Sequence, residues 1–206
     1  MQSTYPTRGG QIQRGQRGVT LLEVLVTILI VAVGLLGLAG LQARIQTAEL
    51  ESYQRVQALV LLQDMVDRLR ANRHEAVQYV TTTPLGTGTA SAVCGAAGGY
   101  AKELCEWNNA LLGASETITL GGVTKNLGAM TDARGCITNP VTTMPYEFVV
   151  SVAWQGMTPT ATPTASTCGQ GQYGSNDANR RVVTTRVLFS CLQSAANGVT
   201  CLATTP

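Results

Sequence analysis

Charged and aromatic residues are scarce in this sequence. Only 13% of its 206 residues are Asp, Glu, Lys or Arg, and only 5% are aromatic. The net charge of +2 is too small to indicate a nucleic-acid partner. Proline is absent between Pro6 and Pro84, and cysteine is absent before Cys94. This composition is typical of an exported domain with strands and long loops, and its length suits one core.

Residues that commonly carry catalysis are also scarce. The single histidine, His74, lies between Arg73 and Glu75 and is predicted to be a solvated surface residue. No base stands near a candidate nucleophile, and no glycine motif for phosphate is present. The cysteines lack the paired Cys-x-x-Cys spacing of zinc sites. We therefore predict no enzymatic activity, no metal, no cofactor and no small-molecule substrate.

One long apolar run extends from Val19 to Leu41 and contains a single charge, Glu23. As a helix it would reach on the order of 35 Å, enough to cross a bilayer. A secretory signal peptide cut after Ala39 is an alternative, but the run is too long for one. The charged side chains before the run are all arginines: Arg8, Arg14 and Arg17. By the positive-inside rule the N-terminus is therefore expected to stay in the cytoplasm.

From Gln42 to about Val80 the pattern is that of an amphipathic helix. Two acid–base pairs stand four residues apart with the acid first, Glu51 with Arg55 and Asp64 with Arg68. Without an internal proline, one helix is predicted to continue from the membrane to about Val80. Its apolar positions recur at steps of three and four: Val56, Leu59, Leu62, Val66, Leu69, Val77 and Val80.

The residues after 80 predict a second helix and a small sheet. A helix over 101–112 would place Leu104, Trp107 and Leu111 on one face. Segment 158–179 is rich in Thr, Pro, Gly and Asn and is predicted to be an exposed loop. Strands are expected at 116–120 with a turn at Gly121-Gly122, at 136–138, at 146–154 and at 181–191, the last two pairing antiparallel.

All six cysteines lie in the segment predicted to be exported. Their even number predicts disulfides in an oxidising compartment. The short loop between Cys94 and Cys105 favours that pair, and the pairing of the others stays open. The candidates are Cys94, Cys105, Cys136, Cys168, Cys191 and Cys201.

Glu23 lies near the cytoplasmic end of the apolar run. A charge at the centre of a membrane helix costs roughly 3 kcal/mol, and less near the interface. One interpretation is that Glu23 reaches the interface. The other is that it pairs with a positive partner, which cleavage between Gly18 and Val19 would create as a new α-amine. That amine could belong to the same chain or to a neighbour.

Three glycines, Gly34, Gly37 and Gly40, stand three residues apart in the run. Small residues at such spacing let helices approach closely in lipid, and glycine also weakens a helix. Glycine is common in membrane helices, so neither role follows from its presence alone.

The segment Gly18-Val19-Thr20-Leu21-Leu22-Glu23 resembles the class III signal of type IV prepilins and pseudopilins. The resemblance implies that a prepilin peptidase cuts after Gly18 and N-methylates Val19, where the family usually has phenylalanine. It assigns Thr20 and Glu23 to subunit pairing. It also implies that the helix can melt locally at its glycines in assembled pili.

Residues 17–75 resemble the minor pilins of the type IV pilus modification protein PilV family. The likeness rests on residues 20–42 and 58–72, with scattered support at Cys105-Glu106-Trp107 and in the strand at 150–154. It implies an α+β fold, type IV pilin-like, with a long N-terminal α-helix packed on a small antiparallel β-sheet. Its implied partners are the inner membrane before assembly, the prepilin peptidase, other minor pilins and the major pilin.

These features predict a leader over 1–18, a transmembrane and filament-core half-helix over 19–41, an amphipathic half-helix over 42–80 and a disulfide-containing head over 81–206. The expected function is that of a minor pilin in a priming or tip complex of the type IV pilus. The expected location is the bacterial inner membrane, with the head periplasmic, and then the filament. A minor pseudopilin of type II secretion and a single-pass anchored periplasmic binding domain remain alternatives.

Overall fold

A computed structural model describes residues 18–114, 116–126, 130–141, 143 and 145–190, without the side chains of 123–125. Most of the leader, together with Cys191 and Cys201, lies outside the described residues. The contacts divide the chain into two units, up to Gln46 and from Thr47 onward. Each unit is described by itself. The fold is α+β, with a long N-terminal helix and a small antiparallel sheet, as the sequence predicts.

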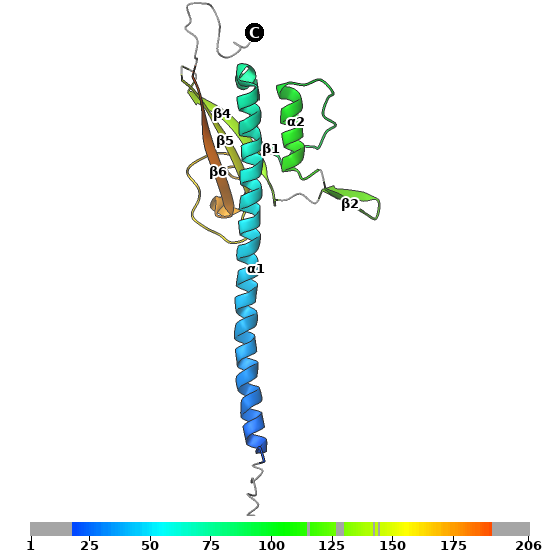
Figure 1. The fold of residues 1–206 in the computed structure, drawn as a ribbon, viewed down its shortest axis with the longest axis vertical. Coiled ribbons are helices and arrows are strands. Elements are labelled where there is room, and N and C mark those ends of the chain that lie inside the picture. The colour runs from blue at the N-terminus through cyan, green and yellow to red at the C-terminus, as the bar shows by residue number, and fades with distance from the viewer. Residues whose placement is uncertain (1–17, 115, 127–129, 142, 144, 191–206) are drawn as a thin grey trace, which may run out of the picture. The chain divides into compact units, whose positions relative to one another are not determined.

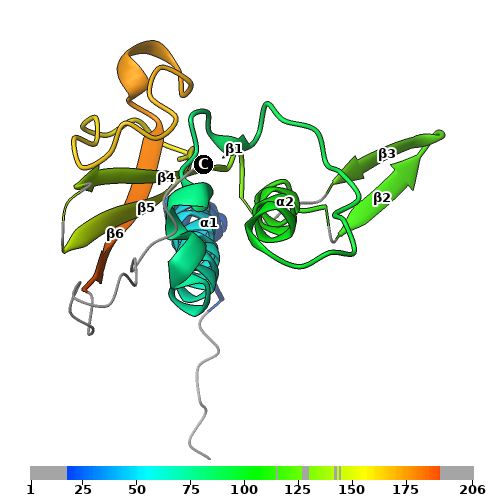
Figure 2. The ribbon, with the colours of Figure 1, turned by 90° about the horizontal axis from the view of Figure 1, so that it is seen from above.

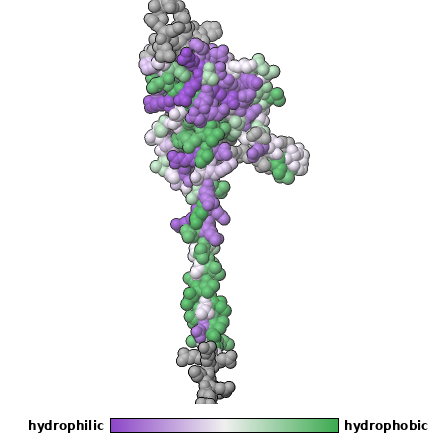
Figure 3. Space-filling model, in the orientation of Figure 1, coloured by the Kyte–Doolittle hydropathy of each residue, from purple (hydrophilic) through white to green (hydrophobic). Residues whose placement is uncertain are grey.

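The first unit contains the N-terminal part of helix α1 (Leu21–Ala71). Its apolar residues are exposed throughout, and they appear as the green surface of the helix in Figure 3. By length and composition α1 is the one helix among the described residues that could cross a membrane.

In the second unit, the C-terminal part of α1 lies with the sheet on one side and helix α2 (Tyr100–Leu111) on the other (Figures 1 and 2). Its buried side chains recur at helical spacing and pack in one core with α2 and the sheet. The stripe differs from the predicted one, because Val56 and Leu59 are about half exposed. The buried residues are Gln54, Ala58, Leu62, Met65, Val66 and Leu69.

The α-helix ends at Ala71, earlier than the predicted Val80. Asn72 leaves helical geometry (φ −110°, ψ 41°), and a 3-10 helix, η1 (Arg73–Tyr79), follows. The Asn72 amide nitrogen donates to Tyr79 Oη and to Glu103 Oε1. These hydrogen bonds therefore end the α-helix at a point where helical periodicity alone would continue it. His74 is exposed, as predicted.

The main sheet has the order β1-β4-β5-β6 and is antiparallel throughout. The β5–β6 pair joins the two segments for which the sequence predicts an antiparallel pair. Strand β4 is longer than the expected 136–138, and β1 was not expected. The strands are β1 (Leu85–Gly86), β4 (Arg134–Val141), β5 (Tyr146–Gln155) and β6 (Arg180–Phe189).

A separate hairpin joins β2 (Thr117–Leu120) to β3 (Val123–Asn126). Both turn glycines have positive φ, 58° at Gly121 and 80° at Gly122, which a two-residue hairpin turn requires. The predicted turn at Gly121-Gly122 is therefore confirmed.

Trp107 of α2 is the largest fully buried side chain, and its Nε1 donates to the Leu61 carbonyl at 2.9 Å. The neighbouring strand residue is Gly135, where a Cβ would lie 2.3 Å from Trp107 Cη2. A glycine on β4 thus makes room for the indole ring. The predicted apolar face of this helix is confirmed, with Leu111 also buried and Leu104 packed beside the core.

The sequence predicts that the long loop after β5 is exposed, but part of this loop is buried. Cys168 and Tyr173 are buried against Ala153 in a second small core, which covers the sheet face opposite α1. The same loop buries Ser151, whose hydroxyl accepts from Ser166 Oγ at 3.0 Å. The low-complexity composition of the loop did not predict these contacts, because they depend on a disulfide between Cys168 and Cys136, which lies on another strand.

Candidate assembly helix and processing site

Helix α1 begins immediately after the Gly18-Val19 pair. The Thr20 carbonyl accepts the backbone N–H of Glu23 at 3.0 Å and that of Val24 at 3.3 Å. Thr20 Oγ1 also accepts the Glu23 N–H at 3.3 Å. Thr20 is therefore the N-cap, and Thr-Leu-Leu-Glu has the spacing of a capping box. The structure places Glu23 in the first turn of α1.

The surface that follows Glu23 is apolar and uncovered within the chain. No residue between Glu23 and Arg44 is charged. The large apolar side chains from Val19 to Leu41 are each between 43% and 83% exposed. A contiguous patch of this size is far larger than a soluble monomer leaves open. Lipid or other protein chains must cover it.

Gly34, Gly37 and Gly40 lie on this uncovered part of α1. Apart from the adjacent residues and the backbone of the helix itself, no described atom lies within 4 Å of the position that a Cβ would take at any of the three. Helix α1 runs through all three positions without interruption. The open notches suit close helix packing. Local melting here stays a prediction.

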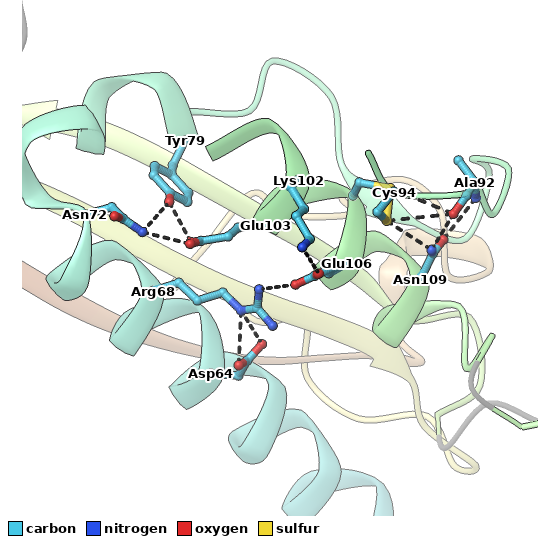
Figure 4. A network of polar contacts seen from close by, with 11 residues as sticks. Asp64, Arg68, Asn72, Tyr79, Ala92, Cys94, Lys102, Glu103, Glu106 and Asn109 are labelled. Atoms are coloured by element: carbon cyan, nitrogen blue, oxygen red, sulfur yellow. Dashed lines mark hydrogen bonds and ion pairs between the residues drawn. A yellow bond between two sulfur atoms is a disulfide. The ribbon is translucent and has the colours of Figure 1, made fainter. Parts of the chain in front are cut away.

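A network of ion pairs holds α2 against the C-terminal part of α1 (Figure 4). Arg68 Nε lies 3.0 Å from Asp64 Oδ2, and Arg68 Nη1 lies 2.7 Å from Glu106 Oε2. The Asp64–Arg68 pair is the one predicted from helix spacing. The hydrogen bond from Arg68 lowers the pKa of Glu106, with smaller effects from the charges of Arg68 and Lys102.

Tyr79 lies at one end of this α1–α2 contact and forms hydrogen bonds there (Figure 4). Its hydroxyl donates to Glu103 Oε2 at 2.6 Å and accepts from the Asn72 amide at 3.2 Å. Burial, reinforced by the Glu103 carboxylate, raises the pKa of Tyr79 far above its usual range. The phenol therefore stays protonated and ties η1 to α2.

Glu51 connects α1 to the loop after β5. Its Oε1 accepts the backbone N–H groups of Met157 at 3.0 Å and Thr158 at 3.2 Å, and lies 3.3 Å from Arg181 Nη2. The predicted partner was Arg55, and Arg181 takes that place because β6 lies next to α1. Burial raises the pKa of Glu51, but hydrogen bonds from Thr158 and Met157 and the charge of Arg181 outweigh it and lower the pKa.

Glu51→Gln is expected to lower the free energy of unfolding by about 1 kcal/mol or less at pH 7, since this carboxylate is partly solvated. The folded pKa is lowered, so its contribution is present above the unfolded pKa and is lost as the pH falls through the folded pKa. Urea unfolding of both proteins in detergent from pH 7 down to pH 3 checks this. A difference that grows toward pH 3 would contradict it.

Two disulfides link segments of the head within the described residues. Cys94 pairs with Cys105, as the short loop between them suggests, and Cys136 pairs with Cys168. The second bond ties β4 to the long loop after β5. Cys191 and Cys201 lie outside the described residues, so their pairing stays open.

Among the described residues, no group of three His, Cys, Asp or Glu is placed to hold a metal ion. Thr20 and Glu23 are brought together by the helix cap. The structure tests neither the cut after Gly18 nor the methylation of Val19. The sequence interpretation missed the contacts of Glu51 with the loop after β5 and with Arg181. It also missed the burial of the Arg180 side chain. No local motif marks either residue, because their partners lie far away in the chain or in an irregular loop.

Two protein families match adjacent parts of the chain. Residues 13–39 match the prokaryotic N-terminal methylation motif. Residues 40–107 match the family described as type IV pilin Tt1218, Tt1218-like. Comparison with curated proteins and with solved structures returns no match. Neither family singles out PilV, so that resemblance stays a prediction.

The first match covers the capped start and apolar part of α1, and the second covers the rest of α1 and most of α2. Proteins with this motif are processed by a prepilin peptidase and assemble with other pilins. Together with the α+β fold, the two matches support a type IV pilin that is anchored through its apolar N-terminal helix.

Proposed function

We propose that the chain is a minor pilin that joins other minor pilins in a membrane-anchored complex. This complex primes the assembly of the type IV pilus or forms its tip. The capped start of α1 carries this proposal. Thr20 begins the helix two residues after Gly18, and Glu23 is the one acid in an otherwise uncovered apolar segment. A cut after Gly18 would create the Val19 amine beside the first helical turn, close to this carboxylate.

In this proposal residues 1–18 are a cytoplasmic leader and 19–41 cross the inner membrane. The head, from residue 81 onward, is periplasmic and is then carried on the filament. The apolar part of α1 stays in lipid before assembly and packs among other pilin helices afterwards. The exchange of lipid for protein keeps the same surface covered, which is the requirement that its composition imposes.

A minor pseudopilin of type II secretion is the second candidate within the same family, since its N-terminal signal looks the same. The likeness of Asp64–Asn72 to PilV favours the pilus. A single-pass anchored binding domain is a candidate of a different class, and it would retain residues 1–18. Co-purification with pilus or secretion subunits separates the first two.

The mature protein is expected to begin at N-methyl-Val19. Intact-mass measurement and N-terminal sequencing of protein taken from the producing cells check this expectation. A start at Met1 would support an uncleaved anchor, and a start at Gly40 would support a cut signal peptide. Either result would rule out pilin processing.

A further inference from the structure

The bond that the proposed processing would cut lies just outside helix α1. Gly18, Val19 and Thr20 are exposed and belong to no helix or strand, and α1 begins at Leu21. Among the described residues, no group donates a hydrogen bond to the Gly18 carbonyl. Proteolysis is favoured where the backbone is exposed and has no such hydrogen bonds. The carbonyl of the Gly18–Val19 bond is therefore accessible in this structure.

Thr20 fixes the point at which α1 begins. Its Oγ1 accepts the Glu23 N–H at 3.3 Å, and its carbonyl accepts the N–H groups of Glu23 at 3.0 Å and Val24 at 3.3 Å. The first N–H groups of a helix have no partner inside it, and an N-cap side chain supplies one of the missing acceptors. Without the Thr20 hydroxyl, the hydrogen bond that favours this start would be lost.

The neighbouring sequence decides in which direction the start would move. Residues 21–26 read Leu-Leu-Glu-Val-Leu-Val, and none of these is a good N-cap. A start as late as Thr27 would leave the backbone before it without helical hydrogen bonds, which is costly in lipid. On the other side, Gly18 is about as good an N-cap as threonine. The start would therefore move back to Gly18, and α1 would gain residues 19 and 20.

A helix that starts at Gly18 would block the bond that is to be cut. The carbonyl of an N-cap residue accepts the first hydrogen bond of its helix, which here would come from the Leu22 N–H. The Gly18–Val19 peptide would then be the first peptide unit of α1 and would have helical geometry. A peptidase would have to break this hydrogen bond before it could reach the Gly18 carbonyl carbon.

We propose that Thr20 is a positioning residue for leader cleavage, which keeps the Gly18 carbonyl outside α1 and accessible to the prepilin peptidase. This inference rests on the proposed function. In the cleavage step the oxygen of a water molecule bonds to the Gly18 carbonyl carbon, and the bond from this carbon to the Val19 nitrogen breaks. Gly18 becomes a carboxylate, the Val19 nitrogen keeps the electron pair and takes up a proton, and no group changes oxidation state.

Cleavage of the full chain by a purified prepilin peptidase in detergent tests the proposal, with intact mass measuring the loss of residues 1–18. Thr20→Val keeps the branched shape but removes the acceptor. We expect its kcat/KM to fall about two- to fivefold, since the loss of an N-cap shifts a helix start by a factor of that order. Thr20→Ser and Thr20→Asn restore an N-cap and should be cleaved at the rate of the unmodified chain.

Thr27→Val is the matched control. Thr27 is also an exposed threonine of α1, but its hydroxyl donates to the Val24 carbonyl at 2.8 Å and does not cap the helix start. This variant should be cleaved like the unmodified chain. Equal rates for Thr20→Val and Thr27→Val would overturn the proposal. So would rescue by serine but not by asparagine, because the peptidase would then contact the hydroxyl of residue 20 directly.

Amide hydrogen exchange measures the position of the helix start itself. No described group accepts the Leu22 N–H in this structure. If Thr20→Val moves the start to Gly18, this N–H gains a partner, so it should exchange more slowly than in the unmodified chain. Unchanged or faster exchange at Leu22 would show that the proposal is wrong. If the unmodified chain is not cleaved at all, the proposed function fails as well, whereas normal cleavage of both chains rejects the role of Thr20 alone.

Discussion

Glu23→Ala is expected to leave the chain in the membrane but to reduce its incorporation into pili by about tenfold or more, which corresponds to roughly 1.4 kcal/mol. The apolar run is long enough to insert without the acid. If the chain is cut after Gly18 as proposed, removing the carboxylate takes away the charged group of the apolar run that would pair with the Val19 amine of its own chain or of a neighbour. That amine would then be left in an apolar assembly without a counter-charge.

The ratio of the protein in sheared pili to that in the inner membrane measures this effect, with co-purification of other minor pilins as a second readout. Glu49→Ala is the matched control. Glu49 is also an exposed acid on α1, but it lies beyond the apolar run. Unchanged piliation and co-purification in Glu23→Ala would show that the pairing role is wrong.

Arg180→Met is expected to lower the free energy of unfolding by about 3–5 kcal/mol, because it leaves a buried acid without its cation. Only 2% of Arg180 is exposed. Its Nη1 donates to the carbonyls of Ser166 at 2.7 Å and Cys168 at 3.1 Å, and its Nη2 donates to the Pro163 carbonyl at 2.8 Å.

The acid in this cluster is Asp177, whose Oδ2 lies 3.4 Å from Arg180 Nε. Asp177 is itself buried and accepts the backbone N–H groups of Gly171 at 2.7 Å and Tyr173 at 3.3 Å. The Arg180 guanidinium thus binds the first part of the loop after β5 through three carbonyls and its last part through Asp177. Methionine fills part of the space but leaves three carbonyls without these donors and the Asp177 carboxylate without its counter-charge.

Arg186→Met provides the matched control on the same strand. Arg186 pairs with Glu147 at 2.8 Å, but its side chain is 74% exposed. Its loss should cost about 0–1 kcal/mol. Urea unfolding followed by tryptophan fluorescence, in detergent, compares the two. A similar small loss in both variants would mean that Arg180 does not organise the loop.

Much of the fold could be predicted from local pattern. The alternation of Tyr146, Phe148, Val150, Val152 and Trp154 predicts the buried face of β5, and Phe148 and Val150 are fully buried. Gly121-Gly122 predicts the hairpin turn, and the short spacing of Cys94 and Cys105 suggests their disulfide. These features depend on neighbours close in sequence, so the sequence contains their determinants.

Other features were wrong or missed because they depend on distant partners. Helix α1 ends at Ala71 because Asn72 bonds to Tyr79 and Glu103, which periodicity cannot indicate. Glu51 pairs with Arg181 and not with the nearby Arg55, because β6 brings Arg181 next to α1. A helical acid has several bases within reach, and only the packed fold selects one.

The sequence by itself determined the apolar N-terminal run and the single acid within it, because a membrane-length run depends only on consecutive residues. Only the tertiary structure decided which face of α1 is buried, and that the loop after β5 covers the sheet. Each of these depends on contacts between residues tens of positions apart, which chain folding alone brings together.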